Sequence, residues 1–233
     1  MATMLTQVAP MSTLYRFPRS SISRRGLLGL GLGLAALPLI RPAFAAATLN
    51  DKDKADIARV EGLFNGIRTM EARFTQVDST GGMAQGKLYM SRPGRLRFEY
   101  DPPVPLLIVA DGTWLCVYDK EIKQVDRYPL GRTPIGVLVR DRISLTDGLE
   151  VTEVTRDSQA FGVTMVAPEH RDDGQLTLIF TENPFEFRQW QVLDAQGINT
   201  VVTLEDIKQG GDFSSALFVF NDPPGTTGLR HER

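Results

Sequence analysis

One glycine-rich spacing in the chain could bind phosphate. Residues 81–87, GGMAQGK, match the pattern G-x-x-x-x-G-K of nucleotide-binding loops. In those loops a Ser or Thr follows the lysine and binds magnesium, but here Leu88 follows it. The flanking residues also predict strand–turn–strand, which lacks the helix N-terminus that offers amide donors to a phosphate. We therefore expect no nucleotide site.

Residues that could bind a metal or act as a nucleophile are few. The sequence has two histidines, His170 and His231, and one cysteine, Cys116. No Gly-x-Ser-x-Gly motif occurs, and the acidic loop at 169–173 is more typical of a solvated turn than of a calcium site. Cys116 lies in the apolar run WLCVY, which favours a small buried hydrophobe. We expect no enzymatic activity, no metal and no cofactor.

Arginines crowd into residues 91–100, SRPGRLRFEY. On a strand, Arg95 and Arg97 share one face, while Leu96 and Phe98 share the other. The arginine face is expected to be solvated, and we give a phosphate-binding patch little weight.

Arg92 differs from these neighbours. The turn residues Pro93 and Gly94 are compatible with a loop of odd length. Such a loop would place Leu88 and Met90 on the same face as the apolar residues of the next strand, and a two-residue loop would not. Arg92 would then stand at the rim of an apolar surface, where its five donors can bind backbone carbonyls or an acidic group.

The N-terminus reads as an export signal. A twin-arginine pattern, Arg24-Arg25, precedes an uncharged apolar run over 26–40, then Arg41 and the small-residue site Ala43-Phe44-Ala45. The run is too short to span a bilayer. We expect residues 1–45 to be removed and the remainder, 46–233, to be one domain in the periplasm of a Gram-negative bacterium.

Removing the signal makes the chain more acidic. The whole sequence has 26 Lys and Arg against 28 Asp and Glu, and residues 1–45 hold five arginines and no acid, so 46–233 carries 21 against 28, net −7. Nucleic-acid binding depends on accumulated cations, so it is not expected. Anionic membranes would also repel the protein.

The remaining pattern is mostly strand, with two helical segments. An amphipathic helix is expected after Asn50 as N-cap, because Ile57, Val60, Phe64 and Ile67 recur at helical spacing. Thr133-Pro134 predicts the start of a short apolar helix through 139.

Alternation and turn residues predict an antiparallel meander. Its expected strands cover 70–74, 88–90, 96–100, 106–110, 113–118, 161–166, 175–181, 185–193, 198–205 and 217–220. The chain is too short for two full sheets with helices besides, so a curled sheet covered by the helices is the natural architecture.

The chain resembles the periplasmic lipoprotein carriers of the LolA family. The resemblance rests on the order and spacing of short matches along the domain. They are Phe74-Thr75-Gln76, Gly86-Lys87-Leu88, Arg92-Pro93-Gly94-Arg95-Leu96, Phe98-Glu99-Tyr100 before Pro102-Pro103, Ile108-Val109-Ala110-Asp111-Gly112, Tyr118-Asp119, Thr133-Pro134 before Val137-Leu138, and Phe218-Val219-Phe220 before Pro223-Pro224-Gly225.

The resemblance implies a mainly β fold, an incomplete, half-open antiparallel β-barrel covered by a helical lid. In the family this interior holds lipoprotein acyl chains, received from an inner-membrane lipoprotein-releasing ABC transporter complex and passed to an outer-membrane acceptor or to the outer membrane. Arg92 matches the arginine that holds the lid shut, Leu96 a position used in cargo transfer, and 135–138 part of the lid. The protein would be a monomer.

The expected cavity and lid residues are apolar and predicted to face inward, where plain core packing is an equal alternative. They are Leu88, Met90, Leu96, Phe98, Tyr100, Ile108, Trp114, Ile135, Val137 and Leu138. Family members usually carry a general-secretion signal, so the twin-arginine pattern is a departure. A carrier of a free lipid such as a hopanoid or phospholipid, and a sensor of envelope lipid or stress with the same fold, therefore stay open.

Overall fold

The computed structural model describes residues 49–228, so the expected export signal at 1–45 lies outside the described residues. The helix predicted after Asn50 is present as α1, Asp51–Gly66. Asn50 accepts a hydrogen bond from the Asp53 amide at 3.0 Å, and the Asp53 carboxylate accepts one from the Asn50 amide at 3.0 Å. This reciprocal cap begins the helix and α1 buries the predicted apolar stripe, from Ile57 to Phe64, against the sheet.

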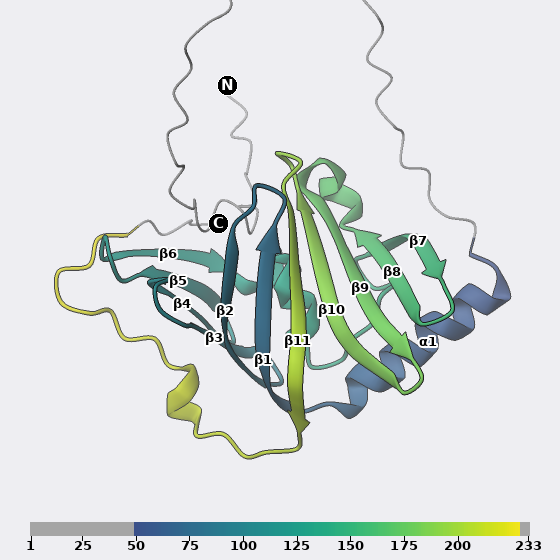
Figure 1. Cartoon of the computed structure of the whole chain (residues 1–233), viewed down its shortest axis with the longest axis horizontal. Coiled ribbons are helices and arrows are strands. Elements are labelled where there is room, and N and C mark those ends of the chain that lie inside the picture. Colours follow the sequence, from purple (N-terminus) through teal and green to yellow (C-terminus); the bar gives the residue numbers. More distant parts are fainter. Residues whose placement is uncertain (1–48, 229–233) are drawn as a thin grey trace, which may run out of the picture.

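Eleven strands form one antiparallel sheet in the order β6-β5-β4-β3-β2-β1-β11-β10-β9-β8-β7 (Figure 1). The strands are β1 Thr69–Asp78, β2 Met83–Ser91, β3 Arg95–Tyr100, β4 Leu106–Asp111, β5 Trp114–Asp119, β6 Gln124–Pro129, β7 Glu150–Arg156, β8 Ala160–Val166, β9 Gly174–Glu182, β10 Phe185–Asp194 and β11 Asn199–Gln209. Only the central pair, β1 and β11, joins strands that are not consecutive in this part of the chain. β6 and β7 are the two edges, so the sheet curls without closing into a barrel.

The loop between β2 and β3 has the predicted odd length. Met90 pairs with Leu96 and Leu88 with Phe98, which leaves the three residues 92–94 as the loop. Paired residues point to the same side of an antiparallel sheet, so the four apolar side chains lie together and are buried.

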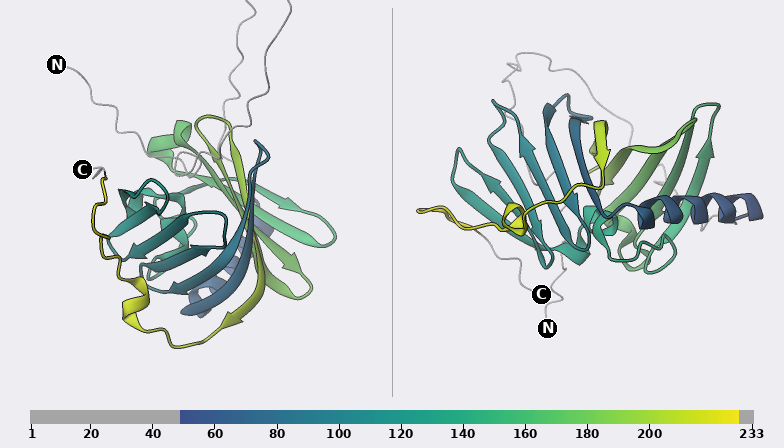
Figure 2. Two further views of the ribbon diagram at one scale, coloured as in Figure 1. Left: turned by 60° about the vertical axis from the view of Figure 1, so that its left-hand side comes forward. Right: turned by 90° about the horizontal axis from the view of Figure 1, so that it is seen from below.

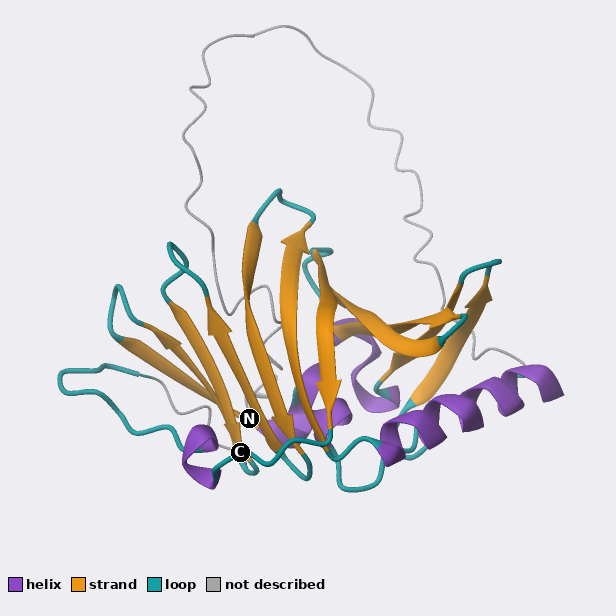
Figure 3. Ribbon diagram, turned by 60° about the horizontal axis from the view of Figure 1, so that its bottom comes forward, coloured by secondary structure: helices purple, strands orange, loops and turns teal. Residues whose placement is uncertain are grey.

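The concave face of the sheet is covered by α1 and by the connection from β6 to β7, residues 130–149 (Figures 2 and 3). This β6–β7 connection contains the short 3₁₀ helices η2, Leu130–Arg132, and η3, Pro134–Val139. Thr133 caps η3 by accepting from the Gly136 amide at 3.2 Å, as the Thr-Pro pair predicts. Buried residues of the sheet, α1 and the β6–β7 connection form one apolar cluster.

The strand predicted at 217–220 is wrong. Ser215–Phe218 instead form the 3₁₀ helix η5, which lies on the outer face of the sheet near β3 and β4. Arg97 donates to the Leu217 carbonyl at 3.1 Å and to Glu99 at 2.7 Å. The arginine face is therefore opposite the apolar face, as predicted, but the C-terminal segment partly covers it.

Candidate functional site

Arg92 lies at the end of β2, and only 6% of it is exposed. Its guanidinium donates to two carbonyls at the end of α1, Phe64 and Ile67, the latter at 2.8 Å. It also donates to two carbonyls that follow η3, Arg140 at 2.9 Å and Asp141 at 2.8 Å. One side chain of the sheet therefore binds both elements that cover the concave face.

The charge of Arg92 suits this position. The C-terminal end of a helix carries partial negative charge, and α1 has no basic residue in its own last turn, so Arg92 supplies the cation. Burial, followed by the nearby Arg68, lowers the pKa of the Arg92 guanidinium, while Asp141 raises it. An arginine remains protonated under such conditions, so the contact is a set of charge-assisted hydrogen bonds.

The β6–β7 connection is also bound directly to α1. The Asn65 side chain donates to the Ile143 carbonyl and accepts from the Ile143 amide, both at 2.9 Å. The Leu145 amide donates to the Glu61 carboxylate at 2.7 Å. These bonds join the two covering elements to each other.

A second arginine fixes the other end of α1. Arg156 of β7 donates to Asp53 at 2.6 Å and to Asp56 at 2.8 Å. Arg59 of α1 pairs with Glu182 at 2.9 Å and lies 3.6 Å over the Phe185 ring. Both ends of the helix are thus attached to the sheet by side chains.

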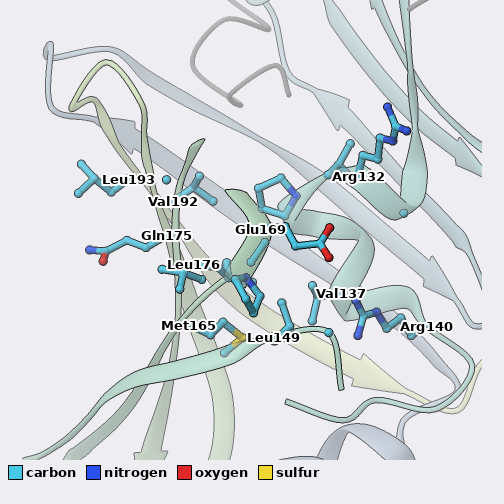
Figure 4. Close-up of a pocket in the computed structure, with 18 residues that line it drawn as sticks. Arg132, Val137, Arg140, Leu149, Met165, Glu169, Gln175, Leu176, Val192 and Leu193 are labelled. Atoms are coloured by element: carbon cyan, nitrogen blue, oxygen red, sulfur yellow. The ribbon is translucent and has the colours of Figure 1, made fainter. Parts of the chain in front are cut away.

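A cavity of about 420 Å³ lies between η2–η3, the 3₁₀ helix η4, Pro168–Asp173, and strands β8 to β10 (Figure 4). Its apolar lining includes Val137, Met165, Leu176 and Val192, and its charged lining residues are Arg132, Arg140 and Glu169. A volume of this size is in the range of small-molecule sites. Of the residues predicted to line a cavity, only Val137 lines this one.

Eight other predicted cavity and lid residues belong to the buried apolar cluster and do not line this cavity: Leu88, Met90, Leu96, Phe98, Tyr100, Ile108, Ile135 and Leu138. The interior is filled by aromatic rings in successive contact. Phe74 contacts Phe98 at 5.2 Å between centroids, Phe98 contacts Trp190 at 6.1 Å, and Trp190 stacks on Phe187 at 6.0 Å. These rings are part of the packed core on the concave side of the sheet.

The prediction that Trp114 faces the interior is wrong. Leu115 and Val117 belong to the apolar cluster, so Trp114 and Cys116, which alternate with them on β5, lie on the outer face. The C-terminal segment covers part of that face, since Tyr118 contacts Phe220 at 5.7 Å. Apolar residues are therefore needed on both sides of β5.

Among residues 49–228, no group of three or more His, Cys, Asp or Glu could hold a metal ion. Burial raises the pKa of the Cys116 thiol to about 11, so it is protonated at neutral pH. The G-x-x-x-x-G-K residues lie in the β1–β2 turn and in β2, without the helix that a phosphate loop needs.

Comparison with known proteins identifies the family. Residues 65–221 match the family model described as outer membrane lipoprotein carrier protein LolA. The chain belongs to the LolA family. The matched region begins within α1 and extends beyond η5, so it includes all eleven strands and Arg92.

The alignments of this LolA-family chain with individual relatives extend over most of each relative's length. The outer-membrane lipoprotein carrier protein of Pseudomonas aeruginosa is 26% identical over 199 residues, which are 78% of this chain and 91% of the relative. The protein of the same name from Chromohalobacter salexigens is 28% identical over 182 residues, 74% and 85% of the two chains. A crystal structure of a LolA superfamily protein from Nitrosomonas europaea superposes with a TM-score of 0.43 at 9% identity, covering 70% of this chain and 97% of that one.

Between residues 49 and 228, no helix has the length and apolar character required to cross a bilayer.

Proposed function

We propose that this protein is a periplasmic carrier that encloses the acyl chains of lipoproteins between its curved sheet and a lid. The lid consists of α1 and the β6–β7 connection. The proposal is supported by the family, whose description is that of a lipoprotein carrier, and by the apolar concave face. The carrier performs no chemistry on its cargo.

The observation that carries the proposal is the buried Arg92. A buried guanidinium is costly unless its donors are satisfied, and here backbone carbonyls of the two lid elements satisfy them. Opening the lid breaks these bonds, and closing it restores them. Lid closure therefore competes with cargo for the same interior, which keeps binding weaker than the acyl chains alone would make it.

Acyl chains are too apolar to leave through water. Burying them is worth about 0.8 kcal/mol per methylene, so three long chains would gain roughly 30 kcal/mol or more. The cargo must therefore pass directly between protein partners or membranes. We infer that an inner-membrane lipoprotein-releasing ABC transporter complex loads the carrier, and that an outer-membrane acceptor, or the outer membrane itself, receives the cargo.

The location follows from the N-terminal pattern. Residues 1–45 are proposed to be a twin-arginine signal that directs export and is then removed. The net charge of −7 left on 46–233 reduces residence on anionic membranes, which suits a carrier that shuttles as a monomer.

The test uses Arg92→Leu, with Arg95→Leu as a matched control, since Arg95 lies nearby on the exposed outer face. Arg92→Leu is expected to bind a lipoprotein but to deliver it poorly to acceptor membranes, because the lid no longer closes against the cargo. Arg95→Leu should deliver normally. Normal delivery by Arg92→Leu would remove this residue from the mechanism.

A carrier of one free lipid is the second candidate. It is favoured by the existing cavity of about 420 Å³, whose size is in the range of small-molecule sites and whose lining is largely apolar. Native mass spectrometry of the protein purified from its host periplasm separates the two. An adduct with the mass of an acylated lipoprotein supports the first candidate, and a small lipid adduct supports the second.

A further inference from the structure

Trp190 buries a hydrogen-bond donor that has nothing to bind. The residue lies on β10 with 1% of its surface exposed, and it is the largest of the fully buried side chains in the described region. Its Nε1–H has no hydrogen-bond partner among residues 49–228. Buried tryptophans usually satisfy this group, so its unpaired state calls for a physical reason.

Trp190 differs from the other buried groups of this kind. The remaining unpaired atoms in the described region are single carboxylate oxygens of Asp126, Glu150 and Asp194. In each of these, the second oxygen accepts a hydrogen bond. The buried Tyr100 hydroxyl also donates, to Gln76 at 2.8 Å. Trp190 alone among them has its whole polar capacity unused.

The strand geometry puts Trp190 two residues along β10 from Val192, which lines the cavity. A bulge between Phe187 and Gln189 shifts the register of β10, so Phe187, Trp190 and Val192 all face the concave side. Val192 lines the cavity, and Trp190 is the next inward-facing residue toward the centre of the sheet. An acyl chain that extends from the cavity along β10 would therefore meet the indole.

The neighbours of Trp190 offer no acceptor. The indole stacks on Phe187 with ring planes 13° apart, and Phe98 approaches from β3 at 6.1 Å. Pure hydrocarbon in this place would leave the N–H as unsatisfied as it is in this structure. A carbonyl oxygen would satisfy it, and the surrounding rings would exclude water from that bond.

We propose that the Trp190 N–H binds a carbonyl oxygen of an ester- or amide-linked acyl chain, so that the carrier selects acylated cargo over plain hydrocarbon. This inference rests on the proposed function and adds to it the chemical feature of the cargo that is recognised. Acylated lipoproteins and ester phospholipids share the carbonyl, whereas ether-linked lipids lack it.

The test compares two lipids that differ only in this group. Dioctanoyl phosphatidylcholine and its dioctyl ether analogue have the same headgroup and chain carbon number, and a synthetic triacylated lipopeptide provides a third probe. Calorimetric titration of residues 46–233 is expected to give about tenfold tighter binding of the ester than of the ether. Trp190→Phe should weaken ester binding by about the same factor and leave ether binding nearly unchanged.

Phe187→Leu is the matched control, because it disturbs the same ring stack but keeps the donor. It is expected to alter ester and ether binding in parallel, so that their ratio stays near ten. The indole N–H resonances provide a direct readout. Trp190 should shift with the ester and not with the ether, while Trp114 on the outer face serves as the internal reference.

The outcomes separate this inference from the proposed function. An ester-to-ether ratio near one together with equal lipopeptide binding by the natural sequence and Trp190→Phe would overturn the role of Trp190 while leaving the carrier proposal intact. A ratio that persists in Trp190→Phe would do the same. Failure of all three probes to bind would overturn both. A Trp190-dependent effect on the lipopeptide alone supports the inference with lipoprotein as the source of the carbonyl, and an effect on phosphatidylcholine supports it with a free lipid.

Discussion

Replacing Arg92 by leucine is expected to loosen the β6–β7 connection without unfolding the sheet. The side chain makes two bonds to this connection, to Arg140 at 2.9 Å and to Asp141 at 2.8 Å. Hydrogen bonds to charged groups contribute about 1.5–3 kcal/mol each, and the desolvation of a buried guanidinium offsets part of that. A net loss of about 2 kcal/mol would make opening of the connection roughly 30-fold more frequent.

Amide hydrogen exchange measures this opening directly. The amide of Gly136 is hydrogen-bonded within the β6–β7 connection, and those of Ile143 and Leu145 are hydrogen-bonded to side chains of α1. Peptides covering 133–145 should therefore exchange roughly 30-fold faster in Arg92→Leu. Peptides from β8 and β9 should not change, and Arg95→Leu should match the natural sequence throughout. If the folded variant exchanges within twofold of the natural sequence at 133–145, Arg92 does not hold the β6–β7 connection in place.

Three further perturbations test other parts of the structure. Arg156→Met should lower the melting temperature at pH 7. The pKa of its partner Asp53 is held below the usual value, first by the hydrogen bond from Arg156. The stabilisation is therefore present above about pH 4 and is lost as pH falls through the lowered pKa. A difference in melting temperature between the variant and the natural sequence that is independent of pH would contradict this. Gly86→Ala should destabilise the fold by about 2 kcal/mol or more in chemical denaturation, since its Cβ would overlap a backbone oxygen of β3. Gly62→Ala, on the exposed side of α1, should instead stabilise the fold by up to about 1 kcal/mol in the same assay. Leu176→Trp should occupy part of the cavity and weaken lipid binding by the folded variant about tenfold. Unchanged affinity would place the lipid elsewhere.

Local patterns sufficed to predict three features of the first half of the domain. The cap at Asn50, the helical stripe and the odd loop at 92–94 each depend on residues a few positions apart, and all three are present. The rim position of Arg92 followed from the loop length alone. Its acceptor carbonyls were attributed to the lid only through the family resemblance.

Other features depend on contacts between distant segments. The apolar run at Trp114 gave no alternation, because the C-terminal segment covers the outer face of β5. Arg156 meets Asp53 and Asp56 across about a hundred residues, and no spacing rule connects them. β6 and β7 were missed because Gln124–Pro129 and Glu150–Arg156 are rich in polar residues, as edge strands commonly are.

The pairing of β1 with β11 has a consequence for how the chain folds. Every other neighbour in the sheet is reached through a local connection, but Phe74 must find Leu204 across nearly the whole domain. Closing such a loop costs entropy before any contact repays it, so we expect the meanders β1–β6 and β7–β11 to form early and to join at this seam in the rate-limiting step. Until the seam closes, β1 and β11 each expose an unpaired backbone edge, and aggregation competes with folding at the middle of the finished sheet.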